Sequence, residues 1–181
     1  MTVSEIMREV EKHPARHCVL TGGEPMVAKD IHALAAALRK AGKHITIETA
    51  GTVPPGGIAC DLASLSPKLK NSAPGERATK AWQERHEKLR LQPGVIREWM
   101  GKYPFQLKFV VMSEADIVEI QSLLSEIGSA IPPEKVLLMS EGVTTEALRA
   151  REPTVLEICK KHGYRYCDRL HIALFGQTRG T

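Results

Sequence analysis

The sequence is poor in cysteine, with four in 181 residues. Cys18, Cys60, Cys159 and Cys167 are too few and too widely spaced for the disulfide framework of a small secreted domain, so we expect free thiols. The sequence also lacks any run of about 18 apolar residues, the length that a membrane-spanning helix needs. Its first 13 residues are charged and helix-forming, unlike a signal peptide. These absences predict a soluble, cytoplasmic protein.

A large excess of one charge is missing as well. The 25 basic and 21 acidic residues give a formal net charge of +4, and the basic residues are spread along the chain. This balance does not favour nucleic-acid binding, but a few basic side chains around one pocket would suit a small anionic ligand. A chain of this length predicts one domain with one hydrophobic core.

Short apolar runs alternate with amphipathic stretches, which predicts an α/β fold with parallel strands. The expected strands are residues 17–22, 44–51, 58–66, 106–112, 135–140 and 170–176. The expected helices are residues 2–13, 28–41, 114–127 and 145–162. In the second of these helices, Ile31, Leu34, Ala35 and Leu38 follow the spacing of one helical face.

Residues 69–102 interrupt this alternation, because they are rich in charge, glycine and proline. We interpret them as an insertion that carries one helix, at about residues 78–91. A mobile start is expected from about Asn71 to Glu76.

Polar or glycine-bearing turns follow four of the predicted strands. They are residues 21–25 (TGGEP), 48–52 (ETAGT), 64–68 (SLSPK) and 140–142 (SEG). The carboxyl ends of parallel strands face one edge of a sheet, where ligands bind. These turns therefore predict a binding site at that edge.

The TGGEP turn is a weak signal by itself. Its two glycines allow a sharp turn and a close approach of the backbone to a ligand, and its proline fixes the exit toward the next helix. A tight turn between a strand and a helix needs glycine for structural reasons alone. No Gly-Lys-Ser/Thr follows, so the turn is not a phosphate-binding loop.

The order of several motifs is more specific. TGGEP, ETAGT, SPK at 66–68, KFVV at 108–111, LMSEG at 138–142 and the ending RLHIALFGQTRGT together resemble the 7-carboxy-7-deazaguanine synthases, a family of radical S-adenosylmethionine enzymes. The resemblance runs from about residue 2 to the last residue. It implies an α/β fold, a partial (β/α) barrel of the radical S-adenosylmethionine type with a mostly parallel sheet.

The resemblance also implies a reaction, that of a carbon–nitrogen lyase in queuosine and deazapurine biosynthesis. In the family, 6-carboxy-5,6,7,8-tetrahydropterin becomes 7-carboxy-7-deazaguanine with loss of ammonia, by a radical ring contraction. The cofactors are S-adenosylmethionine, a four-iron four-sulfur cluster and magnesium. An electron donor such as flavodoxin or ferredoxin is the expected protein partner, and a homodimer is possible. Nucleic acid and membranes are not expected partners.

The matching motifs place binding residues but no catalytic residue. Gly22, Gly23 and Glu24 are expected at the methionine end of S-adenosylmethionine, Pro25 holds their turn, and Glu48 meets the ribose hydroxyls or the methionine amine. The other expected cofactor-binding residues are Ser66, Pro67 and Lys68, followed by Leu138, Met139, Ser140 and Glu141 near the adenine. Substrate contacts are expected from Thr21, His171 and the carboxylate of Thr181. Taken singly, each residue also fits an ordinary structural role.

The sequence departs from the family pattern at the cluster. The family holds it with Cys-x3-Cys-x2-Cys after the first strand, and no such triplet occurs in this sequence. We therefore expect that the first strand and the cluster loop are missing, that residues 1–181 are one truncated core domain, and that this chain alone is inactive. An exposed sheet edge and lower stability would follow from a missing strand.

Two alternatives remain open. Cys159, His162, Cys167 and His171 could form a zinc-binding module, although the two pairs are closer than in usual zinc fingers. The chain could also be a noncatalytic relic that binds S-adenosylmethionine without turnover.

Overall fold

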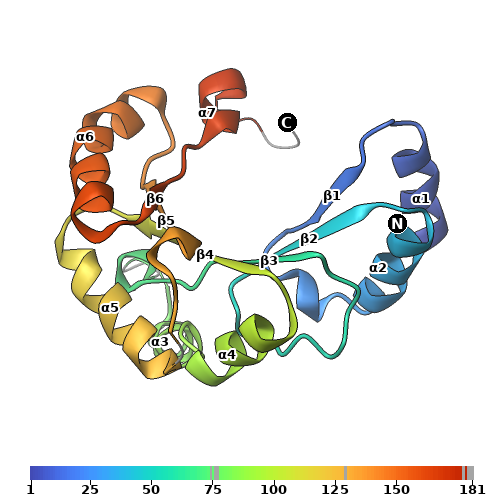
Figure 1. Cartoon of the computed structure of the whole chain (residues 1–181), viewed down its shortest axis with the longest axis horizontal. Coiled ribbons are helices and arrows are strands. Elements are labelled where there is room, and N and C mark those ends of the chain that lie inside the picture. Colours follow the sequence, from blue (N-terminus) through green and yellow to red (C-terminus); the bar gives the residue numbers. More distant parts are fainter. Residues whose placement is uncertain (74, 76–77, 129, 177, 179–181) are drawn as a thin grey trace. The chain divides into compact units, whose positions relative to one another are not determined.

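A computed structural model describes residues 1–73, 75, 78–128, 130–176 and 178 (Figure 1). The chain divides into two compact units. The first unit comprises Met1–Ser66 and Gly94–Gln106, and the second comprises Pro67–Pro93 and Leu107–Thr181. The single domain expected from the length stays a prediction.

The first unit contains three parallel strands, β1 (His17–Leu20), β2 (His44–Thr49) and β3 (Leu62–Leu65), in that order. Along β2, every second residue is buried, which is the alternation of a strand with one face on the core. Ile45, Ile47 and Thr49 form this buried face. Three of the predicted strands are therefore confirmed, with shorter bounds.

Two helices of the first unit contact each other, α1 (Val3–Glu11) and α2 (Ile31–Lys40). At the start of α1, the Thr2 hydroxyl accepts from the Glu5 amide and the Glu5 carboxylate accepts from the Thr2 amide, a reciprocal cap. Helix α2 buries Ile31, Ala35 and Leu38, three of the four residues of its predicted face. Both helices were predicted. A 3-10 helix, η1 (Pro25–Val27), lies between β1 and α2.

A helix that was not predicted from the sequence, α4 (Pro93–Lys102), belongs to the first unit from Gly94 onward. Pro93 occupies its first position, where the missing amide hydrogen has no cost. The helix buries Ile96 and Trp99, and the Trp99 indole donates to the Val53 carbonyl at 2.9 Å. The second half of the predicted insertion therefore contributes to a hydrophobic core.

The second unit contains most of β4 (Phe105–Val111), together with β5 (Val136–Ser140) and β6 (Arg165–Tyr166). These strands are parallel and follow one another in sheet order. The helices α5 (Ala115–Ile127) and α6 (Thr145–His162) agree with the predicted ranges. Helix α6 packs on β5 and β6 (Figure 1). A 3-10 helix, η3 (Pro133–Lys135), precedes β5.

One predicted strand is wrong. Residues 170–176 contain the helix α7 (Leu170–Phe175), and the sixth strand is β6. A short apolar run cannot be assigned to strand or helix by periodicity, and here Ile172 is the buried residue of α7. Strand β6 has only two residues, too few to give a pattern, and is fixed by pairing with Leu137 and Leu138 of β5.

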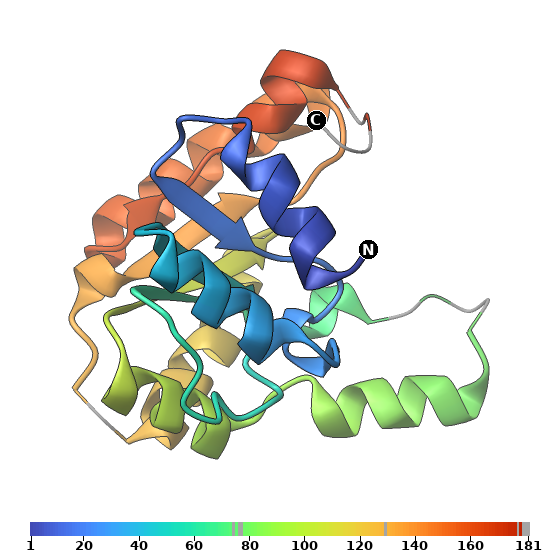
Figure 2. The same cartoon turned by 90° about the vertical axis from the view of Figure 1, so that its right-hand side faces the viewer.

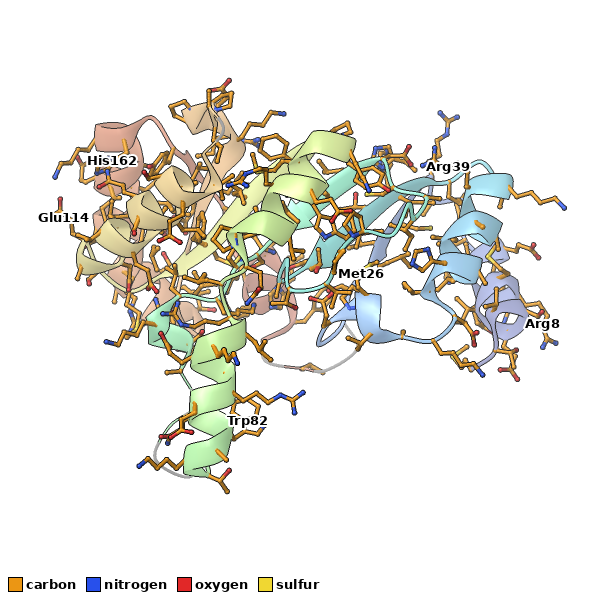
Figure 3. All side chains as sticks on the ribbon, turned by 90° about the horizontal axis from the view of Figure 1, so that it is seen from below. Arg8, Met26, Arg39, Trp82, Glu114 and His162 are labelled. Atoms are coloured by element: carbon orange, nitrogen blue, oxygen red, sulfur yellow. The ribbon has the colours of Figure 1, made fainter. Side chains whose placement is uncertain are left out.

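The predicted helix in the insertion is confirmed as α3 (Lys80–Leu89). None of its ten described residues is buried, and it projects away from α5 and α6 (Figure 2). Its Trp82 side chain is 54% exposed and stacks on His86 (Figure 3). Before α3, a 3-10 helix, η2 (Lys70–Ser72), includes Asn71. Residues 74 and 76 of the segment predicted to be mobile lie outside the described residues, so its mobility stays a prediction.

None of the helices in the described segments is both long and apolar enough to cross a bilayer.

Candidate functional site

The TGGEP turn presents open backbone after β1. Thr21, Gly22 and Gly23 are exposed, whereas Pro25 is buried. Gly22 has a φ of +149°, a conformation that other residues rarely adopt. At Gly22 and Gly23, no described heavy atom lies within 4 Å of the position that a Cβ would take. The turn therefore leaves room for a ligand against its main chain.

Glu24 ties this turn to the end of β2. One carboxylate oxygen accepts from the Thr49 hydroxyl at 2.8 Å, and the other accepts from the same hydroxyl at 2.8 Å and from the Ala50 amide at 3.0 Å. The Met26 amide donates to the first oxygen at 3.2 Å, which caps η1 (Met26 is labelled in Figure 3). The structure thus brings together two of the four predicted turns, through a carboxylate that is occupied by protein donors.

Glu48 and Thr49 have different environments because neighbouring residues of a strand face opposite sides. Thr49 is 2% exposed and contacts Glu24. Glu48 is half-buried and pairs in register with Ser64 of β3. Thr49 was not among the predicted site residues. The alternation of Ile45, Ile47 and Thr49 was the signal that could have placed it on the core side.

The segment 66–68 passes from the first unit to the second. In the first unit, the Ser66 amide donates to the Thr49 carbonyl at 2.7 Å, and Ser66 is 6% exposed. In the second unit, Pro67 is buried and Lys68 is exposed. The Lys68 carbonyl accepts from Arg90 Nη1 at 3.1 Å.

The predicted residues 138–141 form the end of β5 and the start of its turn. Leu138 and Ser140 are buried, and Met139 is half-buried. The Glu141 amide donates to the Val111 carbonyl at 2.9 Å, which holds this turn at the end of β4. Arg151 of α6 donates to the Glu141 carbonyl at 3.0 Å and lies 3.2 Å from its carboxylate. Nothing in the sequence singled out Arg151, because α6 contains several other charged residues.

The predicted substrate residues lie in separate segments. Thr21 is exposed in the first unit, and His171 is exposed on α7 of the second. His171 was expected at the start of a strand, but it lies on the helix α7. Thr181 lies outside the described residues. The site assignments as a whole stay predictions.

The described residues do not fit a metal ion or an iron–sulfur cluster. No group of three or more histidine, cysteine or acidic side chains is close enough to hold a metal among them. The four residues of the zinc alternative are therefore not brought together, and His162 instead lies 3.5 Å from Gln121. Burial raises the pKa of the Cys60 and Cys159 thiols, which opposes the thiolate form that metals bind.

The donor set of the first unit does fit the methionine end of S-adenosylmethionine. The open turn at Gly22 and Gly23 offers carbonyl acceptors, which suit an ammonium group, with space beside them.

Comparison with known proteins agrees with the motifs. Residues 1–69 match the model of the Radical SAM superfamily. The chain is 40% identical to the 7-carboxy-7-deazaguanine synthase of Rhodopirellula baltica, over 99% of this chain and 69% of that protein. This chain belongs to the 7-carboxy-7-deazaguanine synthase family. The synthase of Halobacterium salinarum is also 40% identical, over 100% of this chain and 74% of its own length. The predicted family and enzyme class are confirmed.

A solved structure supports the fold of this synthase family member. The crystal structure of QueE from Escherichia coli matches with a TM-score of 0.63 at 22% identity. The match covers 93% of the chain and 64% of QueE, so the chain spans less than two thirds of that protein. The predicted α/β fold with parallel strands is confirmed, and the rest of QueE has no counterpart in these 181 residues.

Proposed function

We propose that this chain is the part of a 7-carboxy-7-deazaguanine synthase that binds S-adenosylmethionine and the pterin substrate. The reaction of the whole enzyme is the conversion of 6-carboxy-5,6,7,8-tetrahydropterin to 7-carboxy-7-deazaguanine and ammonia. The relatives in Rhodopirellula baltica and Halobacterium salinarum, which carry this name, support the proposal. An electron donor such as flavodoxin or ferredoxin belongs to the proposed reaction as well.

The observation that carries the proposal is the TGGEP turn. Its backbone at Gly22 and Gly23 is exposed, with open space beside it, and Glu24 fixes it to the end of β2. Carbonyl oxygens held in this way can accept hydrogen bonds from the ammonium group of the methionine moiety without the cost of ordering a flexible loop. Glu24 then acts through the geometry of the turn, and its carboxylate stays on Thr49 and Ala50.

The other turns supply complementary chemistry. Lys68 is an exposed cation whose backbone is fixed by Arg90, and it suits the carboxylate of the methionine moiety. The turn at Ser140 and Glu141, held by Arg151, is proposed near the adenine. Thr21 and His171 are proposed to face the pterin.

The radical step is not assigned to residues of this chain. Bound S-adenosylmethionine supplies the radical chemistry only together with an iron–sulfur cluster, and the described residues offer no group that could hold one. The proposal therefore assigns no cluster ligand and no magnesium ligand to the described residues.

Direct binding tests the proposal. Equilibrium dialysis of the purified chain against S-adenosylmethionine is expected to show saturable binding. In Gly23→Val, the new side chain occupies the open space, so we expect binding to be lost while the fold is retained. Gly101→Val is the matched control, because Gly101 also has open space around it but lies on α4. Equal affinity in wild type and Gly23→Val would contradict the placement of the cofactor.

A second experiment separates a part of an active enzyme from a relic that only binds the cofactor. The coding frame before Met1 is read for a Cys-x3-Cys-x2-Cys segment, and the protein that includes it is assayed under anaerobic conditions. Turnover of the pterin by that protein supports the synthase. Cofactor binding without turnover supports the relic.

A further inference from the structure

A buried guanidinium lies behind the predicted cofactor residue Lys68. Arg90 follows α3 as its C-terminal cap, and its side chain is 7% exposed. Nε and Nη2 donate to the two carboxylate oxygens of Glu87 at 2.7 and 2.6 Å. Nη1 donates to the carboxylate of Glu119 on α5 and, at 3.1 Å, to the Lys68 carbonyl. The hydrogen bonds with Glu87 raise the pKa of Arg90, so the guanidinium is charged.

Glu119 holds the same stretch of backbone at a second point. Its other carboxylate oxygen accepts from the Lys70 amide at 2.9 Å. One ion pair therefore fixes both the carbonyl of Lys68 and the amide of Lys70. Leu69 lies between them and is 2% exposed, so its side chain is anchored in the core. Asn71 adds a bond from its amide nitrogen to the Val110 carbonyl of β4, at 3.0 Å.

We infer that Arg90 and Glu119 are positioning residues for cofactor binding, because they fix the backbone from which the Lys68 side chain reaches the methionine carboxylate. The inference rests on the proposed function and adds residues that lie outside the turns themselves. A main chain that is already ordered lets Lys68 bind with less loss of conformational entropy. Arginine suits this role better than lysine, since its planar fork serves Glu87, Glu119 and the Lys68 carbonyl at once.

Glu87 provides a matched control within the same cluster. It is bonded to the same guanidinium, and its hydrogen bonds with Arg90, followed by the nearby charges of Arg90 and Lys70, lower its pKa, but its side chain is 55% exposed. Glu87→Gln therefore changes the charge next to Arg90 and leaves the two bonds to the backbone in place. A role in positioning predicts that this variant keeps its cofactor affinity, whereas Arg90→Lys and Glu119→Ala lose affinity.

The test is calorimetric titration of the full chain with S-adenosylmethionine. We expect Arg90→Lys and Glu119→Ala to bind about tenfold or more weakly, as for other changes that misplace a binding group. The decisive variant is Lys68→Ala combined with Arg90→Lys. If Arg90 acts through Lys68, this double variant binds no more weakly than Lys68→Ala alone. A purely structural defect would weaken binding by the same factor in both backgrounds.

Other outcomes separate the inference from the proposed function. Arg90→Lys with wild-type affinity, or an unchanged factor in the Lys68→Ala background, overturns the inference and leaves the proposed function standing. A wild-type chain that does not bind S-adenosylmethionine overturns both. Thermal unfolding of each variant is followed in parallel, and if Arg90→Lys does not fold, Glu119→Ala and its combination with Lys68→Ala decide. Hydrogen exchange of the Lys70 amide reports directly on its bond to the Glu119 carboxylate. This exchange is expected to be faster in Glu119→Ala than in Glu87→Gln.

Discussion

The hydroxyl of Thr49 lies 2.8 Å from each carboxylate oxygen of Glu24. This contact connects residues that are 25 positions apart in the sequence: Glu24, in the turn that follows β1, and Thr49, the last residue of the neighbouring strand β2. The glutamate of the TGGEP motif thereby becomes part of the framework of the turn. A conservative replacement of Glu24 should first affect the stability and geometry of the turn. Through these changes it should then affect ligand binding.

Glu24→Gln is expected to lower the free energy of unfolding by about 1.5–3 kcal/mol, the range for hydrogen bonds to charged groups. The reason is that an amide nitrogen replaces one of two oxygens that accept from Thr49 and Ala50. Urea unfolding followed by circular dichroism gives the value. Thr46→Val on the same strand is the control, since Thr46 takes no part in the Glu24 contacts, and an equal loss in both variants would contradict this role.

Trp99→Phe should lower the free energy of unfolding by about 1–3 kcal/mol, because the Val53 carbonyl loses its donor in a partly buried place. Trp99 has no exposed surface. Trp82→Phe is the matched control, and its 54% exposed side chain predicts a change within about 0.5 kcal/mol. Chemical denaturation of the two variants measures both effects. Equal values would show that α4 does not contribute to the core as described.

Gly51→Ala is expected to be more destabilising than Gly42→Ala. Both glycines have positive φ, at +71° and +70°, so both variants carry a backbone cost of about 1–2 kcal/mol. A Cβ at Gly51 would lie 2.9 Å from Cγ1 of Ile96, whereas at Gly42 no described heavy atom lies within 4 Å. Thermal unfolding measures the difference. Adding Ile96→Ala should reduce the extra cost of Gly51→Ala, and strict additivity of the two changes would count against the contact.

The four thiols should differ in their rate of alkylation. Cys60 and Cys159 are buried, and burial raises their pKa, so they hold less thiolate at a given pH. Cys18 and Cys167 are partly exposed. Iodoacetamide at pH 8, followed by peptide mass spectrometry, is expected to label Cys18 and Cys167 first. Early labelling of Cys60 in the native protein would contradict its burial.

The same thiols predict a pH dependence of stability. The pKa of Cys60 in the folded protein is above its ordinary value, so the unfolded chain loses this proton at a lower pH than the folded chain. The contribution of Cys60 to the free energy of unfolding is therefore fully present below about pH 8.5, the ordinary thiol pKa. This contribution decreases as the pH rises above that value. Urea unfolding between pH 7 and pH 10 measures the slope. In Cys60→Ser, the decrease above about pH 8.5 should be smaller.

Much of the fold could be predicted from the sequence, because the longer elements repeat their pattern. The helix from Thr145 to His162 has the predicted bounds, and α2 buries the predicted face. The errors arose where patterns were short or ambiguous. Residues 69–102 were interpreted as an insertion with one helix because they are rich in charge, glycine and proline, although proline is favoured at the first position of a helix, where Pro93 lies. Residues 170–176 are apolar in a way that fits either a strand or a helix.

The candidate site was less predictable than the fold. The motifs identified the turns, but they could not say which side chains are engaged with the protein itself. Glu24 is such a case, since its partner Thr49 follows the predicted residue Glu48 and faces the other side of β2. Arg90 is another, because it lies in a charged segment where many side chains are exposed. Only the folded chain shows that its guanidinium is buried.

The path of the chain through α4 has a practical consequence for dissecting the protein. Residues 94–106 return to the first unit after the chain has already entered the second. A single proteolytic cut or a single stop codon therefore cannot release either unit whole. A fragment that ends at Ser66 would lack Trp99 and leave the Val53 carbonyl without its donor. Separate expression of the first unit requires a recombinant connection between Ser66 and Gly94.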